Sequence, residues 1–262
     1  MRRSFLTPAL WIPAGLAIAL LGLPLVALIV RAPWAQLPEL LGRSEVLQAL
    51  GLSLGTASIA TVVSLVLGIP LALVLARSAD WPAVPRRLLR TLVTVPLVLP
   101  PVVGGVALLL LLGRRGLIGQ FLPFQIPFST SAVVIAQVFV AMPFLVLAVE
   151  GAVRASDRRF ETAAATLGAT RWTILRRVTL PLVAPGVSAG ALLCFTRALG
   201  EFGATITFAG SFPGVTQTLP IATYLELQRD PDAAIALSLT LMVVSVAVLV
   251  TLRDRWVPGL TP

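Results

Sequence analysis

The sequence of 262 residues contains no lysine and no histidine, so all 20 of its basic residues are arginines. A phosphate-binding P-loop requires a lysine, and histidine supplies many of the general bases, haem ligands and zinc ligands of proteins. We therefore expect no P-loop ATPase, no catalytic residue and no metal site in this chain. The single cysteine, Cys194, excludes an internal disulfide and lies in an apolar run, as a small buried side chain would.

Charged residues are also scarce, at 12% of the chain against about 25% in soluble domains. Hydrophobic residues make up 57% of the chain, and the mean hydropathy is +0.97. The formal net charge of +9 comes from arginines that flank apolar runs in small groups, so we expect no binding to nucleic acid. The composition predicts a polytopic membrane protein, in contact with lipid.

Six apolar runs are long enough to cross about 30 Å of hydrocarbon as helices. The alternative for the first run is a secretory signal peptide, whose apolar region is usually shorter, at about 7 to 15 residues. We predict an all-α fold with one transmembrane domain over residues 1–262. Its six spans are expected at about residues 10–30, 47–76, 88–112, 131–149, 182–199 and 233–252.

Two predicted spans have an unusual composition. The second is rich in small residues that let helices approach closely, namely Gly51, Ser53, Gly55, Thr56, Ala57 and Ser58. The third is predicted to bend because each proline removes a backbone donor, and it contains Pro96, Pro100, Pro101, Gly104 and Gly105. The sequence leaves open whether this bend lines a pathway or is only a kink in the packing.

The distribution of arginines also predicts how the chain is oriented across the membrane. With successive connections on opposite sides, fourteen arginines fall on the side of the two termini, and five fall on the other. The richer side includes Arg2 and Arg3 before the first span and Arg253 and Arg255 after the last. By the positive-inside rule, both termini and the 157–181 connection are cytoplasmic.

The connection at 157–181 is predicted to form a helix, a glycine bend and a second helix. Phe160, Ala163, Ala164 and Leu167 share one face of the first helix, which Ser156 or Asp157 can cap and Gly168 can end. Thr170 can cap the second helix, and Pro181 is expected to interrupt it.

This segment resembles the cytoplasmic loop of ABC importer permeases, whose pattern runs from Glu-Ala-Ala through a glycine to Leu-Pro. Ala163, Ala164, Gly168, Val178, Leu180 and Pro181 match that pattern. Thr162 holds the position of its glutamate, and Glu161 lies one residue earlier. The resemblance implies a coupling helix that seats on a separate ATPase subunit, through Phe160, Glu161, Thr162, Ala163, Ala164, Leu167, Gly168, Ala169, Leu180 and Pro181. The alternative is an amphipathic helix that lies on the membrane surface.

A second distinctive stretch, residues 196–220, contains the run Gly-Glu-Phe-Gly-Ala-Thr at 200–205 and Thr-Gln-Thr-Leu-Pro at 216–220. These runs resemble those of the molybdate branch of ABC importer permeases. The resemblance does not separate molybdate from tungstate, and sulfate permeases are close relatives.

This stretch offers hydroxyls and exposed backbone to a tetrahedral dianion, so we predict a gate region at the outer end of the fifth span. Arg197 and Glu201, four residues apart, are expected to pair, either for function or to hold the structure in register. The predicted pathway residues are Thr196, Arg197, Gly200, Glu201, Gly203, Thr205 and Thr207.

The resemblance implies a type I ABC importer permease that acts as a homodimer in the cytoplasmic (inner) membrane. Two ATPase subunits that bind ATP and magnesium, and a periplasmic or lipid-anchored oxyanion-binding protein, would complete the transporter. The chain would then be a transport subunit and not an enzyme, with no cofactor of its own. Alternating access would carry molybdate or tungstate into the cytoplasm.

Two other classes fit the sequence poorly. An ion-coupled secondary transporter uses buried carboxylates and usually has repeated halves, whereas we identify only Glu201 as a plausible acid within the membrane and see no repeat. A hydrolase without histidine or lysine would need an aspartate pair, and no aspartate lies in a predicted span.

Overall fold

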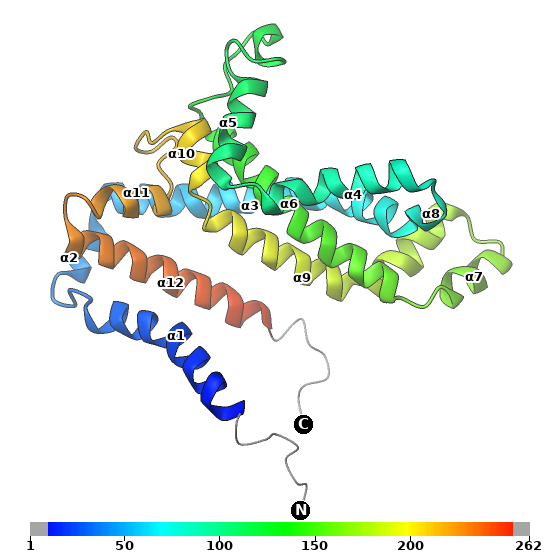
Figure 1. The fold of residues 1–262 in the computed structure, drawn as a ribbon, viewed down its shortest axis with the longest axis horizontal. Helices are drawn as coiled ribbons and strands as arrows, with labels where there is room; N and C mark the ends of the chain where they lie inside the picture. Colours follow the sequence, from blue (N-terminus) through cyan, green and yellow to red (C-terminus); the bar gives the residue numbers. More distant parts are fainter. Residues whose placement is uncertain (1–9, 254–262) are drawn as a thin grey trace, which may run out of the picture.

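The computed structural model describes residues 10–253, which fold almost entirely into helices (Figure 1). Five helices are long and apolar enough to cross a membrane, and a sharply bent pair makes up a sixth candidate span. The five are α1 (Trp11–Val30), α3 (Ser44–Arg77), α6 (Thr130–Ala155), α9 (Leu180–Leu199) and α12 (Pro231–Arg253). The predicted all-α fold is therefore confirmed. Arg2, Arg3, Asp254 and Arg255 lie outside the described residues.

Helices α3, α6 and α9 form the core, and α6 lies against both of the others. Leu145 of α6 is fully buried between two glycines. A Cβ atom on Gly68 of α3 would lie 3.1 Å from one methyl of Leu145, and one on Gly190 of α9 would lie 2.9 Å from the other. Small residues thus let the three helices approach closely. Of the six small residues that the sequence singled out in the second span, three are buried (Ser53, Thr56 and Ala57) and three are exposed (Gly51, Gly55 and Ser58).

The third predicted span is two helices, α4 (Ala83–Val98) and α5 (Pro101–Leu112), whose axes differ by 118°. Leu99 and Pro100 between them are extended. The prolines cause this break, because a residue before proline is disfavoured in the helical region and proline itself donates no hydrogen bond. The expected bend is present, but it is a full break, and α5 projects away from the bundle (Figure 1).

Pro181 does not end the second helix of the 157–181 segment, contrary to expectation. The short helix α8 (Arg171–Ile174) continues through a π turn (Leu175–Thr179) into α9, with Pro181 in the first turn of α9. The backbone N–H of Leu180 donates to the carbonyl of Leu175, five residues back. This wider turn changes the hydrogen-bond register just before the proline, which lacks an N–H, so the helix continues.

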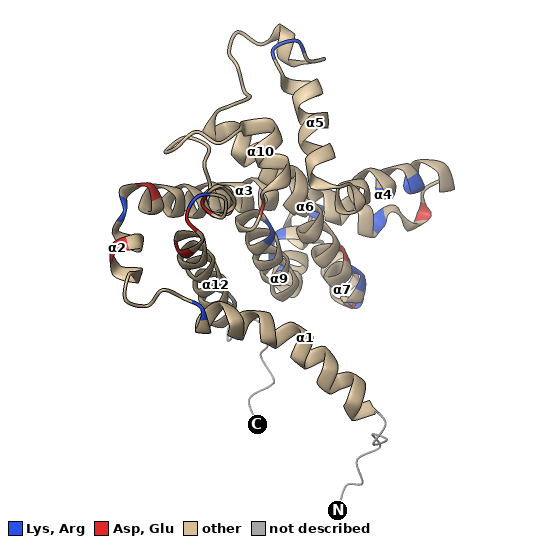
Figure 2. Cartoon of the chain, turned by 60° about the vertical axis from the view of Figure 1, so that its left-hand side comes forward, with Lys and Arg blue, Asp and Glu red and all other residues tan. Residues whose placement is uncertain are grey.

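Three short helices occur where we predicted only connections: α2 (Leu37–Gly42), α10 (Gly203–Ala209) and α11 (Leu219–Glu226). Helices α2 and α11 lie at one end of the molecule, and α7 (Arg159–Thr166) lies at the other (Figure 1). Charged residues gather near helix ends and connections, whereas the middles of the long helices carry few (Figure 2). Such a distribution suits helices that cross a hydrocarbon layer.

Candidate functional site

Helix α7 begins and ends as the sequence predicts. Asp157 accepts a hydrogen bond through Oδ1 from the backbone N–H of Arg159, at 2.9 Å. Gly168 follows the helix with a φ of +83°, a conformation that glycine adopts without the strain that a Cβ atom causes. Thr170 caps α8 by accepting from the N–H of Thr173. The predicted unit of helix, glycine bend and helix is therefore present, apart from its end at Pro181.

The outer face of α7 is apolar and uncovered within the described chain. Phe160 is 58% exposed and Leu167 is 88% exposed, and Ala163 lies between them on the same face. Trp172 on the following helix is 67% exposed. Ala164, predicted on the same face, is instead partly buried. A large apolar area at the tip of a loop is typical of a surface that another protein covers.

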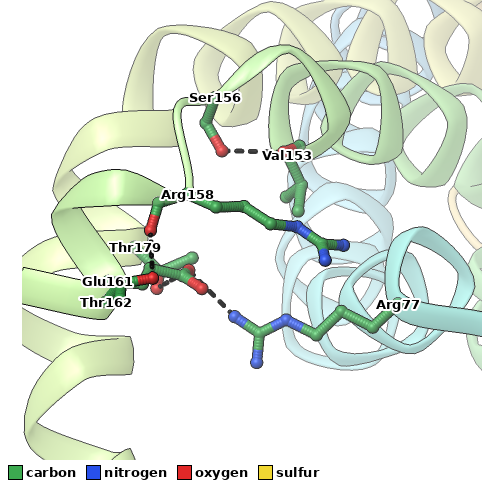
Figure 3. A network of polar contacts seen from close by, with 7 residues as sticks. All are labelled: Arg77, Val153, Ser156, Arg158, Glu161, Thr162 and Thr179. Carbon is green, nitrogen blue, oxygen red and sulfur yellow. Dashed lines mark hydrogen bonds and ion pairs between the residues drawn. The ribbon is translucent and has the colours of Figure 1, made fainter. Parts of the chain in front are cut away.

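The inner face of α7 carries Glu161, which contacts two other elements of the same chain (Figure 3). Its Oε1 accepts a hydrogen bond from Nη2 of Arg77, the last residue of α3, at 3.0 Å. The same oxygen accepts from Oγ1 of Thr179, the last residue of the π turn, at 2.5 Å. Thr162 instead bonds to the carbonyl of Arg158 within its own helix, at 3.1 Å. The acid therefore faces the bundle, and the threonine at the family's glutamate position is exposed.

Thr162 lines two of the open hollows that flank α7. One, of about 460 Å³, lies between α3, α7 and α8 and is also lined by Arg77, Glu161 and Arg171. The other, of about 430 Å³, is lined by Asp157, Arg158, Arg159, Ala163 and Thr166.

A buried carboxylate that we did not predict lies near the same end of the molecule. Helix α6 runs six residues beyond the predicted span end at Val149, so Glu150 belongs to it and its side chain is only 3% exposed. Its Oε1 lies 2.7 Å from Nη2 of Arg154 and 3.5 Å from Nη1 of Arg90 on α4. Glu201 is therefore not the only acid buried in the bundle. The i, i+4 spacing of Glu150 and Arg154 was the sequence signal for this pair.

At the end of α9, the expected ion pair is present. Nη1 of Arg197 lies 2.6 Å from Oε2 of Glu201, whose side chain is 1% exposed. Oε1 of Glu201 accepts a hydrogen bond from the N–H of Ala204, at 2.8 Å. Glu201 thus holds the turn between α9 and α10, and its charge is compensated by Arg197 and by a backbone amide.

Two of the three predicted hydroxyls of this region bond to their own helices. Thr196 donates to the carbonyl of Leu192, at 2.9 Å, and Thr207 donates to that of Gly203, at 2.8 Å. The hydroxyl of Thr205 is buried and has no hydrogen-bond partner within residues 10–253. A role of these residues in a pathway stays a prediction.

The gate region packs on α5, far along the chain from it (Figure 1). A Cβ atom on Gly203 would lie 2.9 Å from Cβ of Pro101, and one on Gly105 would lie 2.7 Å from the carbonyl oxygen of Ala204. Helices α5 and α10 are therefore in backbone contact. The structure brings the broken third span and the gate region together, and it places α7 elsewhere.

Within residues 10–253, the structure contains no cluster of three or more histidine, cysteine, aspartate or glutamate residues that could hold a metal ion. Glu161 and Glu150 each pair with an arginine of another helix, and Glu201 pairs with Arg197 at the end of α9.

Comparison with known proteins adds to this geometry. A family model described as a binding-protein-dependent transport system inner membrane component matches residues 68–258. The molybdenum transport system permease protein ModB of Mycobacterium tuberculosis is 51% identical over 94% of this chain and 93% of its own length. ModB of Escherichia coli is 40% identical over 80% of this chain and 92% of its own. The sulfate transport system permease protein CysT of E. coli is 33% identical over 89% of this chain and 87% of its own length.

Solved structures show the same fold at lower identity. A bacterial ABC transporter for alginate, in complex with an alginate-bound periplasmic protein, superposes with a TM-score of 0.74 at 17% identity, over 93% of this chain and 91% of its own. The methionine ABC transporter MetNI in an inward-facing conformation superposes with a TM-score of 0.64 at 17% identity, over 79% of this chain and 93% of its own.

Proposed function

The chain belongs to the family of binding-protein-dependent transport system inner membrane components, and we propose that it is the membrane-spanning permease subunit of an ABC importer for molybdate or tungstate. The observation that carries this proposal is identity to molybdenum permeases along nearly the whole chain, 51% for the mycobacterial protein against 33% for the sulfate permease. Molybdate and tungstate are oxyanions of almost equal size and charge, so the proposal includes both.

In this proposal, a separate ATPase subunit docks on α7. The exposed apolar face formed by Phe160, Ala163 and Leu167 supports such a contact, and so do the two hollows beside it. No lysine is available in this chain for a P-loop. Two copies of the permease with two ATPase subunits would convert ATP binding and hydrolysis into alternating access.

We place α7 and both chain termini in the cytoplasm. The excess of arginine on that side supports the assignment. Helices α2 and α11 then lie at the outer end, because they occupy the opposite end of the molecule from α7 (Figure 1). A binding protein would deliver substrate from that side.

The gate region suits weak, transient contact with a dianion. Arg197 is already paired with Glu201, so this turn offers no free positive charge that would trap the substrate. The hydroxyls of Thr196 and Thr207 are satisfied within their helices. A pathway of this kind conducts without a deep energy minimum, and selectivity then rests mainly with the binding protein.

Uptake of labelled molybdate into proteoliposomes tests the proposal. The vesicles contain this chain, its cognate ATPase subunit and its cognate binding protein, with tungstate or sulfate as competitor. We expect ATP-dependent uptake that tungstate blocks and sulfate does not. Equal competition by sulfate would indicate a sulfate importer, and uptake without ATP would contradict the importer assignment.

A further inference from the structure

We propose that Glu161 is a positioning residue of transport, which fastens α7 to the ends of α3 and α9 of its own chain. This inference rests on the proposed function, since it concerns how a movement of α7 reaches the spans. It assigns Glu161 a role inside the permease, in place of the contact with an ATPase that the sequence pattern implies.

The contacts of Glu161 converge on a single atom. Oε1 accepts from Arg77 at 3.0 Å and from Thr179 at 2.5 Å (Figure 3). Arg77 is the last residue of α3, and Thr179 directly precedes Leu180, the first residue of α9. One carboxylate oxygen on α7 therefore joins the ends of two core helices that also pack on each other.

Little else holds α7 to the bundle. Among its residues only Glu161 and Ala164 are partly buried, and the rest are exposed. The helix packs on α8 and on the π turn, and the pair with Arg77 extends to α3. Glu161 itself is mostly shielded, with 26% of its side chain exposed. A push on the outer face of α7 therefore reaches α3 through this ion pair.

The second contact of Glu161 lies at the π turn that leads into α9. Its hydrogen bonds span five residues, and such turns in helices often occur at functional sites. Thr179 closes that turn and donates to Glu161. The carboxylate thus fixes α7 to the point where the helical register changes, so that α7 and the base of α9 move together.

Four variants of the reconstituted complex test the inference: Glu161→Gln, Arg77→Gln, the double variant, and Asp80→Asn as the matched control. Asp80→Asn likewise turns an acid into its amide, at an exposed position three residues after Arg77 that lies outside α7 and outside both hollows. The readouts are molybdate uptake per ATP hydrolysed and the amount of ATPase subunit that co-purifies with the permease.

We expect Glu161→Gln and Arg77→Gln to lower uptake per ATP by similar factors, between about twofold and thirtyfold. Uptake per ATP in the double variant should fall no further than in either single variant. The amount of ATPase subunit that co-purifies should be unchanged in all four variants. Asp80→Asn should keep the same uptake per ATP hydrolysed as the parent complex. Loss of the ATPase subunit from Glu161→Gln, with a normal ratio in the complexes that remain, would show that Glu161 contacts the ATPase and would overturn the inference.

A measurement that does not depend on transport separates this inference from the proposed function. Thermal unfolding of the purified chain in detergent, for the same parent and variants, gives a double-mutant cycle between Arg77 and Glu161. Non-additive shifts in Tm would support the ion pair even if the parent complex took up no molybdate. Additive shifts would overturn the inference even if the parent complex imported molybdate with ATP.

Discussion

Gly105 of α5 lies directly against Ala204 of α10, so close that a Cβ atom on the glycine would be 2.7 Å from the alanine carbonyl oxygen. That distance is shorter than any ordinary carbon–oxygen contact. The broken third span and the gate region are therefore joined at a position where only glycine fits, and they are expected to move as one unit.

Gly105→Ala should separate α5 from α10 and lower the free energy of unfolding by about 1 to 3 kcal/mol, the usual cost of overpacking. Thermal unfolding in detergent measures this loss. Gly51→Ala is the matched control, since a Cβ atom at Gly51 meets no atom within 4 Å. It should be neutral or stabilising by up to about 1 kcal/mol, because alanine favours a helix over glycine. Equal effects of the two substitutions would contradict the close contact.

Gly168→Val should impair transport through backbone conformation alone. Its φ is +83°, and there is open space around a Cβ atom at this position, so the penalty is strain of about 1 to 3 kcal/mol and not a clash. Gly168→Asn should be milder, since asparagine tolerates positive φ better than other residues. The measurement is ATP-driven uptake by the reconstituted complex. Similar losses for valine and asparagine would show that the bend is not the cause.

Glu150→Ala should lower the free energy of unfolding by about 1 to 3 kcal/mol, since it removes the acid that pairs with Arg154 and Arg90. This is less than the loss expected of a fully buried pair, because both arginines are about half exposed and solvent screens them. Thermal unfolding in detergent reports the change, with Glu45→Ala at an exposed position as control. A Tm equal to that of the control would exclude a stabilising role for the cluster.

A double variant with Phe160→Ser and Leu167→Ser should fold normally and lose the ATPase subunit. Both side chains are exposed, so their replacement leaves no cavity, whereas an interface core depends on such apolar contacts. Co-purification of the ATPase subunit with the permease is the readout. Phe121→Ser serves as control, since Phe121 is 79% exposed and lies outside α7. Full retention of the ATPase subunit by the double variant would place the docking surface elsewhere.

Local signals in the sequence predicted much of the candidate site. Asp157, Gly168 and Thr170 are found in the capping and bend roles expected of their residue types, because those roles depend on backbone within a few residues. The pair of Arg197 with Glu201 followed from helical spacing. The partners of Glu161 were not predictable, since Arg77 is 84 residues away along the chain.

The sequence by itself determined that this protein lies in a membrane and where its long apolar helices run, because hydropathy and the positions of proline and glycine act within single segments. The tertiary structure alone decided which helices share the core, that Glu150 also pairs with Arg90 of α4, and that Glu161 points toward the bundle. It also decided that Pro181 continues a helix through a π turn and that the third span breaks by 118°. These outcomes depend on packing between segments that are distant in sequence, and no local pattern encodes the direction in which a side chain meets another helix.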